Sequence, residues 1–364
     1  MKLKDIIRVF EKTAPFAFQE SYDNSGLQTG NPEMEINAAL ICLDVTEEVM
    51  VEAVTLKVNL IISHHPLIFK EIKSLTGRNY TERILIRALK ADIAILSVHT
   101  NFDNITAGVS SKICEKLDLK NISVLDAMKN NLVKLVFFVP DVHAEAVREK
   151  VFEAGAGVIG NYDMCSFNNR GEGSFRASET ADPFVGEKGK LHFEKETRVE
   201  TILPAVLTDQ VVDALVKAHP YEEVAYDLYP LSNRYPSAGF GLTGELKEAM
   251  DEKPFLELLK IKFNAGCVRH TKLLNRKIKK VAVCGGSGSF LLGKAIESGA
   301  EVFISGDFKY HQFFEAENRI MIADIGHYES EQFTKELFYE LLIKNYPKFA
   351  LYLSEANTNP INYL

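Results

Sequence analysis

Two adjacent histidines, His64 and His65, follow an apolar run with the composition of a β-strand, in the segment ISHHPLIF. Asp103 comes after a second such run, in SVHTNFDN, and His327 and Glu331 come after a third, in GHYESE. Imidazoles combined with carboxylates suit borderline divalent ions such as zinc, iron, manganese or cobalt, whereas ligand sets made only of oxygen suit magnesium or calcium. These residue types therefore predict a metal site.

The number of candidate ligands predicts two ions. A catalytic zinc ion commonly takes three protein ligands and keeps a position for water, so five ligands are too many for one ion. A helix starting just after His327 would place Glu331 on the same face, and we expect Glu331 to bridge two ions. We expect His64 and His327 to bind one ion, and His65 and Asp103 to bind the other.

Further polar side chains near the same strand ends could support the ligands. We expect His99 to stand behind the ligands rather than bind metal, because Asp103 already serves its ion. Asp44 and Asp307 end strand-like runs and could orient ligands or water. His311, in SGDFKYHQF, is either a general acid or base near the metals or a histidine on a helix surface.

Other polar or reactive segments give weaker indications. The glycine-rich run CGGSGS could cradle an anion with its backbone N–H groups, or it could simply be a tight turn from strand to helix. The five cysteines lack CxxC spacing and fit reduced thiols, with Cys42 and Cys284 expected in the core. The remaining histidines show no ligand spacing and are expected on the surface: His143, His192, His219 and His270.

The segments that carry these residues alternate between strand and helix patterns. Strand-like runs are AALICLD, NLIISH and DIAILSV, with the helical TERILIRALKA between the last two; the alternation resumes after about Phe255 with KKVAVCGG, VFISGD and MIADIG. Such alternation predicts βαβ units and parallel sheets, hence the α/β fold class. Functional groups on parallel sheets collect beyond the carboxyl ends of the strands, where all the candidate ligands fall.

The two core segments echo each other. Cys42 and Ser63 end strand-like runs 21 residues apart, and Cys284 and Ser305 do the same. Each half then reaches a histidine that is followed four residues later by an acid. We therefore expect a pseudo-duplicated α/β core with parallel-type sheets.

The middle of the chain has a different pattern. Its runs LVKLVFFVP, DVHAEAVREKVFEAG, RVETILP, TDQVVDALVKAHP and AYDLYPL, with a polar, glycine-rich stretch between them, suggest a β-α-β-β-α-β order. That order predicts a ferredoxin-like α+β domain inserted into the core. The predicted division is residues 1–125 for the first half of the core, 126–245 for the insert and 246–364 for the second half.

The composition of the 364 residues limits the classes of partner. The formal net charge of −8 argues against non-specific binding to nucleic acid, whose affinity depends on lysine and arginine neutralising phosphates. No apolar run reaches the length of a membrane span, and the start of the chain lacks the apolar region of a secretory signal. We expect a cytoplasmic protein without a membrane partner.

Seven segments taken together resemble a known family. YDNSGLQTGNP, LDVTEEV, ISHHPLIF, SVHTNFDN, VAVCGGSGSF, ISGDFKYH and GHYESE are similar to the motifs of the GTP cyclohydrolase 1 type 2 homologue family of dinuclear-metal-centre proteins, in the family's order. Tyr22 departs from the pattern, which leads us to expect tryptophan there. The resemblance implies a toroidal homohexamer whose dinuclear sites face the interior. It assigns ligand roles to His64, His65, Asp103, His327 and Glu331.

The resemblance extends to the insert, whose GEGSFRAS and HPYEEVAYDLYPL stretches are similar to those of the family's longer members, with a fold like the trimeric PII and CutA proteins. We expect a metal-dependent hydrolase of a nucleotide, phosphoester or cyclic amide. GTP ring opening is not expected, because authentic GTP cyclohydrolase I holds zinc with two cysteines and a histidine, a set this chain lacks. The alternative is a metal-binding scaffold or regulator whose insert senses a ligand or partner.

Overall fold

The computed structural model describes residues 1–364 and divides into two compact units. The larger unit contains Met1–Asp126 and Ser237–Leu364, and the smaller unit contains Ala127–Pro236. Asp126 and residues 237–245, which the sequence pattern assigned to the insert, belong to the larger unit, because the two strands that contain them lie in a six-stranded sheet of that unit. No helix combines the length and apolar character needed to cross a membrane.

The first sheet of the larger unit has five strands in the order β1-β4-β3-β2-β15. Neighbours are parallel from β4 to β15, and β1 pairs antiparallel with β4. Cys42 lies opposite Ser63, and Ser63 lies opposite Ser97, so three parallel strands end at one edge. The strands are β1 (Gly26–Thr29), β2 (Ala38–Cys42), β3 (Leu60–Ser63), β4 (Ala94–Ser97) and β15 (Ala350–Leu353).

The second sheet has six strands in the order β11-β14-β13-β12-β10-β5. β12, β13 and β14 are parallel neighbours, and β11 pairs antiparallel with β14. The series β11-β14-β13-β12 thus has the order and directions of β1-β4-β3-β2, an arrangement that a duplicated core would have. The strands are β5 (Lys120–Lys129), β10 (Arg234–Asp251), β11 (Arg269–His270), β12 (Lys277–Ser287), β13 (Val302–Gly306) and β14 (Met321–Asp324).

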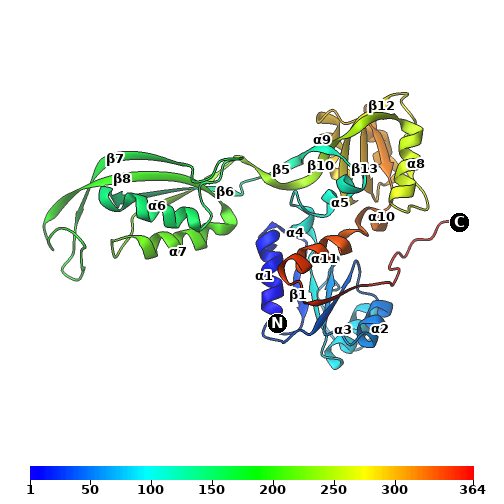
Figure 1. Ribbon diagram of the computed structural model, residues 1–364, viewed down its shortest axis with the longest axis horizontal. Coiled ribbons are helices and arrows are strands. Elements are labelled where there is room, and N and C mark those ends of the chain that lie inside the picture. The colour runs from blue at the N-terminus through cyan, green and yellow to red at the C-terminus, as the bar shows by residue number, and fades with distance from the viewer. The chain divides into compact units, whose positions relative to one another are not determined.

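Helices cover both faces of the first sheet. α2 (Glu47–Thr55) and α3 (Tyr80–Lys90) pack on one face, where Val49 and Ile84 join strand residues in one apolar cluster. α1 (Leu3–Thr13) and α11 (Thr334–Asn345) lie beside the sheet on the other side (Figure 1), with the rings of Phe10 and Phe338 in edge contact at 5.3 Å. Every residue of β2, β3 and β4 is consequently buried, as parallel strands between helical layers require.

Side-chain caps begin the two helices α2 and α3. Asn79 caps α3 by accepting a hydrogen bond from Glu82 N through its side chain, and Thr46 caps α2 by accepting one from Val49 N. The helices not yet described are η1 (Phe16–Phe18), α4 (Thr100–Asp103), α5 (Val109–Lys116), α8 (Glu252–Lys262), η4 (Ser289–Leu291), α9 (Leu292–Glu297), η5 (Tyr310–Ala316) and α10 (His327–Glu331).

The smaller unit is an antiparallel sheet with its own core. Its strand order is β7-β8-β6-β9, and α6 and α7 contribute Val147, Val151, Val211 and Leu215 to a cluster with the sheet. The chain passes through strand, helix, two strands, helix and strand, in the order that the sequence pattern predicted. The elements are β6 (Leu132–Pro140), η2 (Asp141–His143), α6 (Ala144–Glu153), β7 (Ser166–Arg176), β8 (Leu191–Pro204), η3 (Ala205–Leu207), α7 (Thr208–Ala218) and β9 (Tyr226–Leu231).

Candidate metal centre

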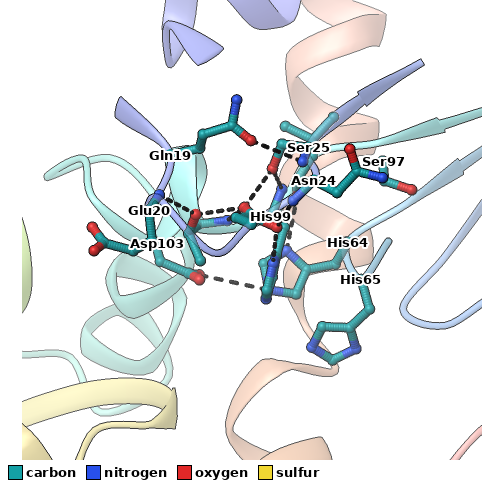
Figure 2. Close-up of polar contacts among 12 residues, drawn as sticks. Gln19, Glu20, Asn24, Ser25, His64, His65, Ser97, His99 and Asp103 are labelled. Atoms are coloured by element: carbon teal, nitrogen blue, oxygen red, sulfur yellow. Dashed lines mark hydrogen bonds and ion pairs between the residues drawn. The ribbon is translucent and has the colours of Figure 1, made fainter. Parts of the chain in front are cut away.

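Three strand ends of the larger unit bring the five predicted ligands together. His64 and His65 directly follow β3, Asp103 ends the short helix α4 that follows β4, and α10 carries His327 and Glu331 after β14. Figure 2 shows His64 and His65 close to each other and a dashed line from Asp103 to His64. The two halves of the core therefore contribute to one site.

The five side chains form two groups that share Glu331. In the first group, His64 Nε2 lies 3.6 Å from Asp103 Oδ1 and 3.7 Å from Glu331 Oε1. In the second, Glu331 Oε2 lies 3.0 Å from both His65 Nε2 and His327 Nε2. Each oxygen of the Glu331 carboxylate thus faces a different group, which is the arrangement expected of a bridge.

The division of ligands differs from the one inferred from the sequence. His64 groups with Asp103 rather than with His327, and His65 groups with His327 rather than with Asp103. Neighbouring strands of one parallel sheet place the residues after β3 and β4 side by side, so His64 meets Asp103. His65 comes one residue later and presents its ring to His327 of the other half, 3.2 Å away between the two Nε2 atoms.

These atoms have the burial and spacing of a metal site. His64 Nε2 and Asp103 Oδ1 are buried and make no hydrogen bond. Leaving such groups unpaired is costly, unless a cation satisfies them. Two ligands about 2.0–2.1 Å from one tetrahedral ion lie roughly 3.3 Å apart, which matches the 3.0 and 3.2 Å separations in the second group. The donor set fits divalent ions of the zinc type.

Each histidine around the site is held through its Nδ1 atom. Nδ1 within hydrogen-bonding distance of an acceptor fixes the ring orientation and leaves Nε2 to point into the site, as in metal-binding histidines generally. The four contacts are His64 with the carbonyl of Val98 at 2.9 Å, His65 with Asp44 at 2.7 Å, His99 with Asp23 at 2.8 Å and His327 with Asp307 at 2.7 Å. The orienting roles predicted for Asp44 and Asp307 thus have a direct structural basis.

His99 and Asp23 form a pair that the sequence analysis only half anticipated. The ring of His99 stands against His64 and His65, and these three histidines form a third group of possible ligands. Asp23 also accepts hydrogen bonds from Ser25 and Thr100, so its carboxylate is fully engaged. Asp23 was not singled out because the strand that follows it, β1, was not predicted from the sequence; the available signal was its place in the motif YDNSG.

The charges at the site are strongly coupled. Burial acts to lower the pKa of His65, but its hydrogen bond to Asp44 and the charge of Glu331 raise that pKa to about 10. The charge of Glu331 also raises the pKa of His327 to about 11. Burial and the nearby charge of Glu331 raise the pKa of Asp103 to about 7. Without a metal, the site therefore retains protons that a bound cation would displace.

The glycine-rich segment at the end of β12 makes room for Glu331, and its glycine N–H groups are not open to an anion. A Cβ atom on Gly286, whose φ is +61°, would lie 2.2 Å from Glu331 Oε1. The N–H groups of Gly285, Gly286 and Gly288 donate to the hydroxyls of Ser110, Ser330 and Ser305. Because these donors are already used, the tight-turn interpretation holds, and the anion-binding one is not supported.

Two further histidines, His311 and His219, lie away from the metal centre. His311 is exposed on η5, where its ring contacts Tyr310 and Phe314, and it does not line the cavity at the metal centre. The surface interpretation therefore fits His311, and an acid or base role within this chain does not. His219 was expected on the surface but is buried in the smaller unit, with Nε2 2.9 Å from the carbonyl of Phe138.

The site opens into a cavity of about 740 Å³. Its walls include His65, His99, Asp103, His327 and Glu331, so both groups of ligands border it. Cys284 also lines the cavity, but burial raises the pKa of its thiol, and it belongs to none of the ligand groups. A volume of this size accommodates a small metabolite.

Comparison with known proteins gives matches over the full chain. The sequence model of the family described as Duf34/NIF3 (NGG1p interacting factor 3) matches residues 1–360. Proteins named GTP cyclohydrolase 1 type 2 homolog from Halalkalibacterium halodurans and Bacillus subtilis are each 38% identical to it, with 99% of this chain and 98% of the relative covered. A solved Bacillus cereus protein described as related to NIF3 is 37% identical, with a TM-score of 0.87 over 100% of this chain and 99% of the other.

Proposed function

The chain belongs to the Duf34/NIF3 family, and we propose that it is a hydrolase that depends on two divalent metal ions. The observation that carries this proposal is the position of Glu331, whose two carboxylate oxygens face two separate groups of ligands. Its relatives' name agrees with the family resemblance of the sequence motifs, although we do not propose GTP ring opening for this chain, which lacks the cysteine-rich zinc set of authentic GTP cyclohydrolase I.

The residues of the metal centre have two kinds of role in this proposal, binding metal and orienting the ligands. His64, Asp103 and Glu331 would hold one ion, and His65, His327 and Glu331 would hold the other. Two such ions, drawn from zinc, iron, manganese or cobalt, supply Lewis acidity and lower the pKa of water. The carboxylates of Asp44 and Asp307 keep the rings of His65 and His327 in position, as the distances of 2.7 Å indicate.

His99 adds a polar group that need not be used by a metal. Its Nδ1 contacts Asp23, and its ring borders the cavity, so its remaining nitrogen can form a hydrogen bond with a bound substrate. The aspartate fixes the imidazole for that contact. We therefore propose for His99 a supporting role beside the five ligands, without binding metal itself.

The second candidate function is a metal-binding scaffold or regulator. The family description refers to an interacting factor, and the smaller unit has its own apolar core, as a separate sensing module would. We also propose that this unit is a ferredoxin-like insert of the PII and CutA type, on the basis of its strand order. The homohexameric assembly and the cytoplasmic location remain proposals drawn from the sequence.

A screen separates the two functions. Purified protein, loaded with zinc, manganese or cobalt, is tested against phosphodiesters, nucleotides, cyclic amides and peptides. A hydrolase should act on a member of one class only when metal is present, and Glu331→Gln should abolish that activity. Lack of turnover with every class, together with partner capture that survives Glu331→Gln, would favour the scaffold.

A further inference from the structure

We propose that the substrate of this centre is a planar nitrogen-containing ring that is neutral or cationic and carries no phosphate group. This inference rests on the proposed hydrolytic function. It concerns the cavity that opens from the two ligand groups, about 740 Å³ in volume. Three properties of that cavity lead to it: its aromatic walls, its charge and the state of its backbone donors.

Aromatic rings surround the metal centre. Tyr22, Phe69, Tyr80 and Phe290 line the cavity, and each keeps more than half of its side chain exposed: 69, 51, 58 and 64%, respectively. Large rings left open to solvent around a polar centre gain free energy when a ligand covers them. A flat ring in the ligand can pack against these aromatic side chains through offset or edge contacts.

The cavity is acidic. Besides the ligands Asp103 and Glu331, its lining includes the carboxylates of Glu20 and Asp44, and the lining residues of the larger unit include no lysine or arginine. The carboxylates of the ligands, with Asp44 and Asp307 behind them, offset much of the charge that two divalent ions bring. A polyphosphate would meet further carboxylates and no cationic side chain, whereas a neutral or cationic ring would not be repelled.

The three glycine N–H groups of the glycine-rich turn are not free to bind an anion. The N–H groups of Gly285, Gly286 and Gly288, at the turn where a phosphate could otherwise be held, donate to serine hydroxyls instead. Binding a phosphate there would require breaking these hydrogen bonds. The engaged N–H groups of this turn and the acidic lining of the cavity therefore both disfavour a bound phosphate.

Among the hydrolytic reactions open to the centre, these features favour opening of a cyclic amide. The oxygen of water forms a bond to the ring carbonyl carbon, and the C–N bond of the ring breaks. The nitrogen takes up a proton, so the product carries an amine and a carboxyl group. The aromatic walls would hold the ring so that its carbonyl faces the two ligand groups.

The test compares ligands that differ only in phosphate. Binding of uridine, cytidine, adenosine and guanosine, and of their 5′-triphosphates, is measured by calorimetry on the full chain loaded with zinc, with metal content checked afterwards. We expect a nucleoside to bind at least about tenfold more tightly than its triphosphate. Equal or tighter binding of the triphosphates, or no binding of any nucleoside, would overturn the proposal.

Matched variants locate the effect in the cavity. Phe290→Ala should weaken nucleoside binding about two- to tenfold, and Phe314→Ala should not, although Phe314 is exposed to a similar extent at 65% and lies outside this cavity. Glu20→Gln should strengthen triphosphate binding and leave nucleoside binding unchanged. Equal effects of Phe290→Ala and Phe314→Ala on nucleoside binding would show that the nucleosides do not bind in this cavity, which would contradict the proposal.

Turnover distinguishes this inference from the function on which it rests. Metal-dependent hydrolysis of a phosphoester, with no action on phosphate-free cyclic amides such as hydantoin, would support the proposed hydrolytic function. It would refute the proposed preference for a ring without phosphate. If the nucleosides bind as expected but metal-loaded protein hydrolyses nothing, the preference for a ring without phosphate is supported as a binding property, and the proposed hydrolytic function is refuted.

Discussion

The Nε2 atoms of His65 and His327 lie 3.2 Å apart, although the two residues are 262 positions apart in the chain. Each ring is fixed from behind by an aspartate, so neither can turn away without losing a hydrogen bond. Two imidazole nitrogens aimed at each other are favourable only if they share a proton or a cation. Glu331 Oε2, 3.0 Å from both, completes three donors around one point.

The first prediction concerns the bridge. Glu331→Ala should reduce the metal content from about two ions per chain to below one, because both groups lose a ligand. Asp103→Ala should empty mainly the group of His64 and leave the ion held by His65 and His327. Elemental analysis and anomalous diffraction measure the two variants. Identical single-site losses in both would show that Glu331 does not bridge.

The second prediction concerns the aspartates behind the rings. Asp44→Asn and Asp307→Asn should each weaken binding at the group of His65 and His327 by roughly 10- to 100-fold, because the ring loses its charged acceptor. Occupancy at the group of His64 and Asp103 should change little. Metal titration with a competing chelator measures both affinities. Equal weakening of both groups would mean that the aspartates act through general stability.

The third prediction concerns space at the bridge. Gly286→Ala should displace Glu331 and lower the occupancy of both groups, since its Cβ atom would lie 2.2 Å from Glu331 Oε1 and its φ of +61° disfavours a side chain. Gly293→Ala, in α9, is the matched control because its Cβ atom would meet nothing within 4 Å. Metal content that stays normal in Gly286→Ala would contradict the geometry of the bridge.

The fourth prediction is a pH dependence. In metal-free protein the pKa values of His65, His327 and Asp103 are raised to about 10, 11 and 7. For the histidines, this stabilises the folded metal-free protein most below their unfolded pKa of about 6.5, and the contribution is lost as pH rises toward 10–11. The raised pKa of Asp103 likewise lowers metal-free stability as pH rises from about 4 to 7.

Metal binding displaces these protons, so the increase in Tm caused by zinc should grow with pH between about 6 and 8.5. Thermal unfolding of metal-free and zinc-loaded protein at several pH values measures it. Calorimetry in buffers of different ionisation enthalpy should also detect proton release. A zinc effect that shrinks as pH rises would contradict the prediction.

The fifth prediction concerns the smaller unit. Replacing residues 127–236 with a short Gly-Ser linker should preserve folding and metal content, because all five ligands lie in the larger unit. The linker can be short since β5 and β10 are neighbours in one sheet, with Ser123 and Thr243 joined by a side-chain hydrogen bond of 2.9 Å. Circular dichroism and elemental analysis check the outcome. Loss of metal would show that the smaller unit supports the centre.

The sequence by itself determined the buried parallel strands β2, β3, β4, β12, β13 and β14 and the residue types at their ends, but not β1, β5, β11 or β15. Parallel strands buried on both faces must be almost wholly apolar, so AALIC, LIIS and MIAD are legible as strands, and the polar residues that follow them stand out. The spacing from His327 to Glu331 also sufficed, because residues four apart share a helix face whatever surrounds the helix.

Tertiary structure alone decided which ligands work together and what holds them. The pairing of His65 with His327 depends on how two halves of the core meet, and no local spacing encodes that. The contact of His99 with Asp23 joins a loop to a strand end 76 positions away. His311, on η5 after β13, is exposed and lies outside the cavity at the metal centre, which its spacing did not reveal. Local patterns specify elements, whereas a metal centre consists of contacts between elements distant in the chain.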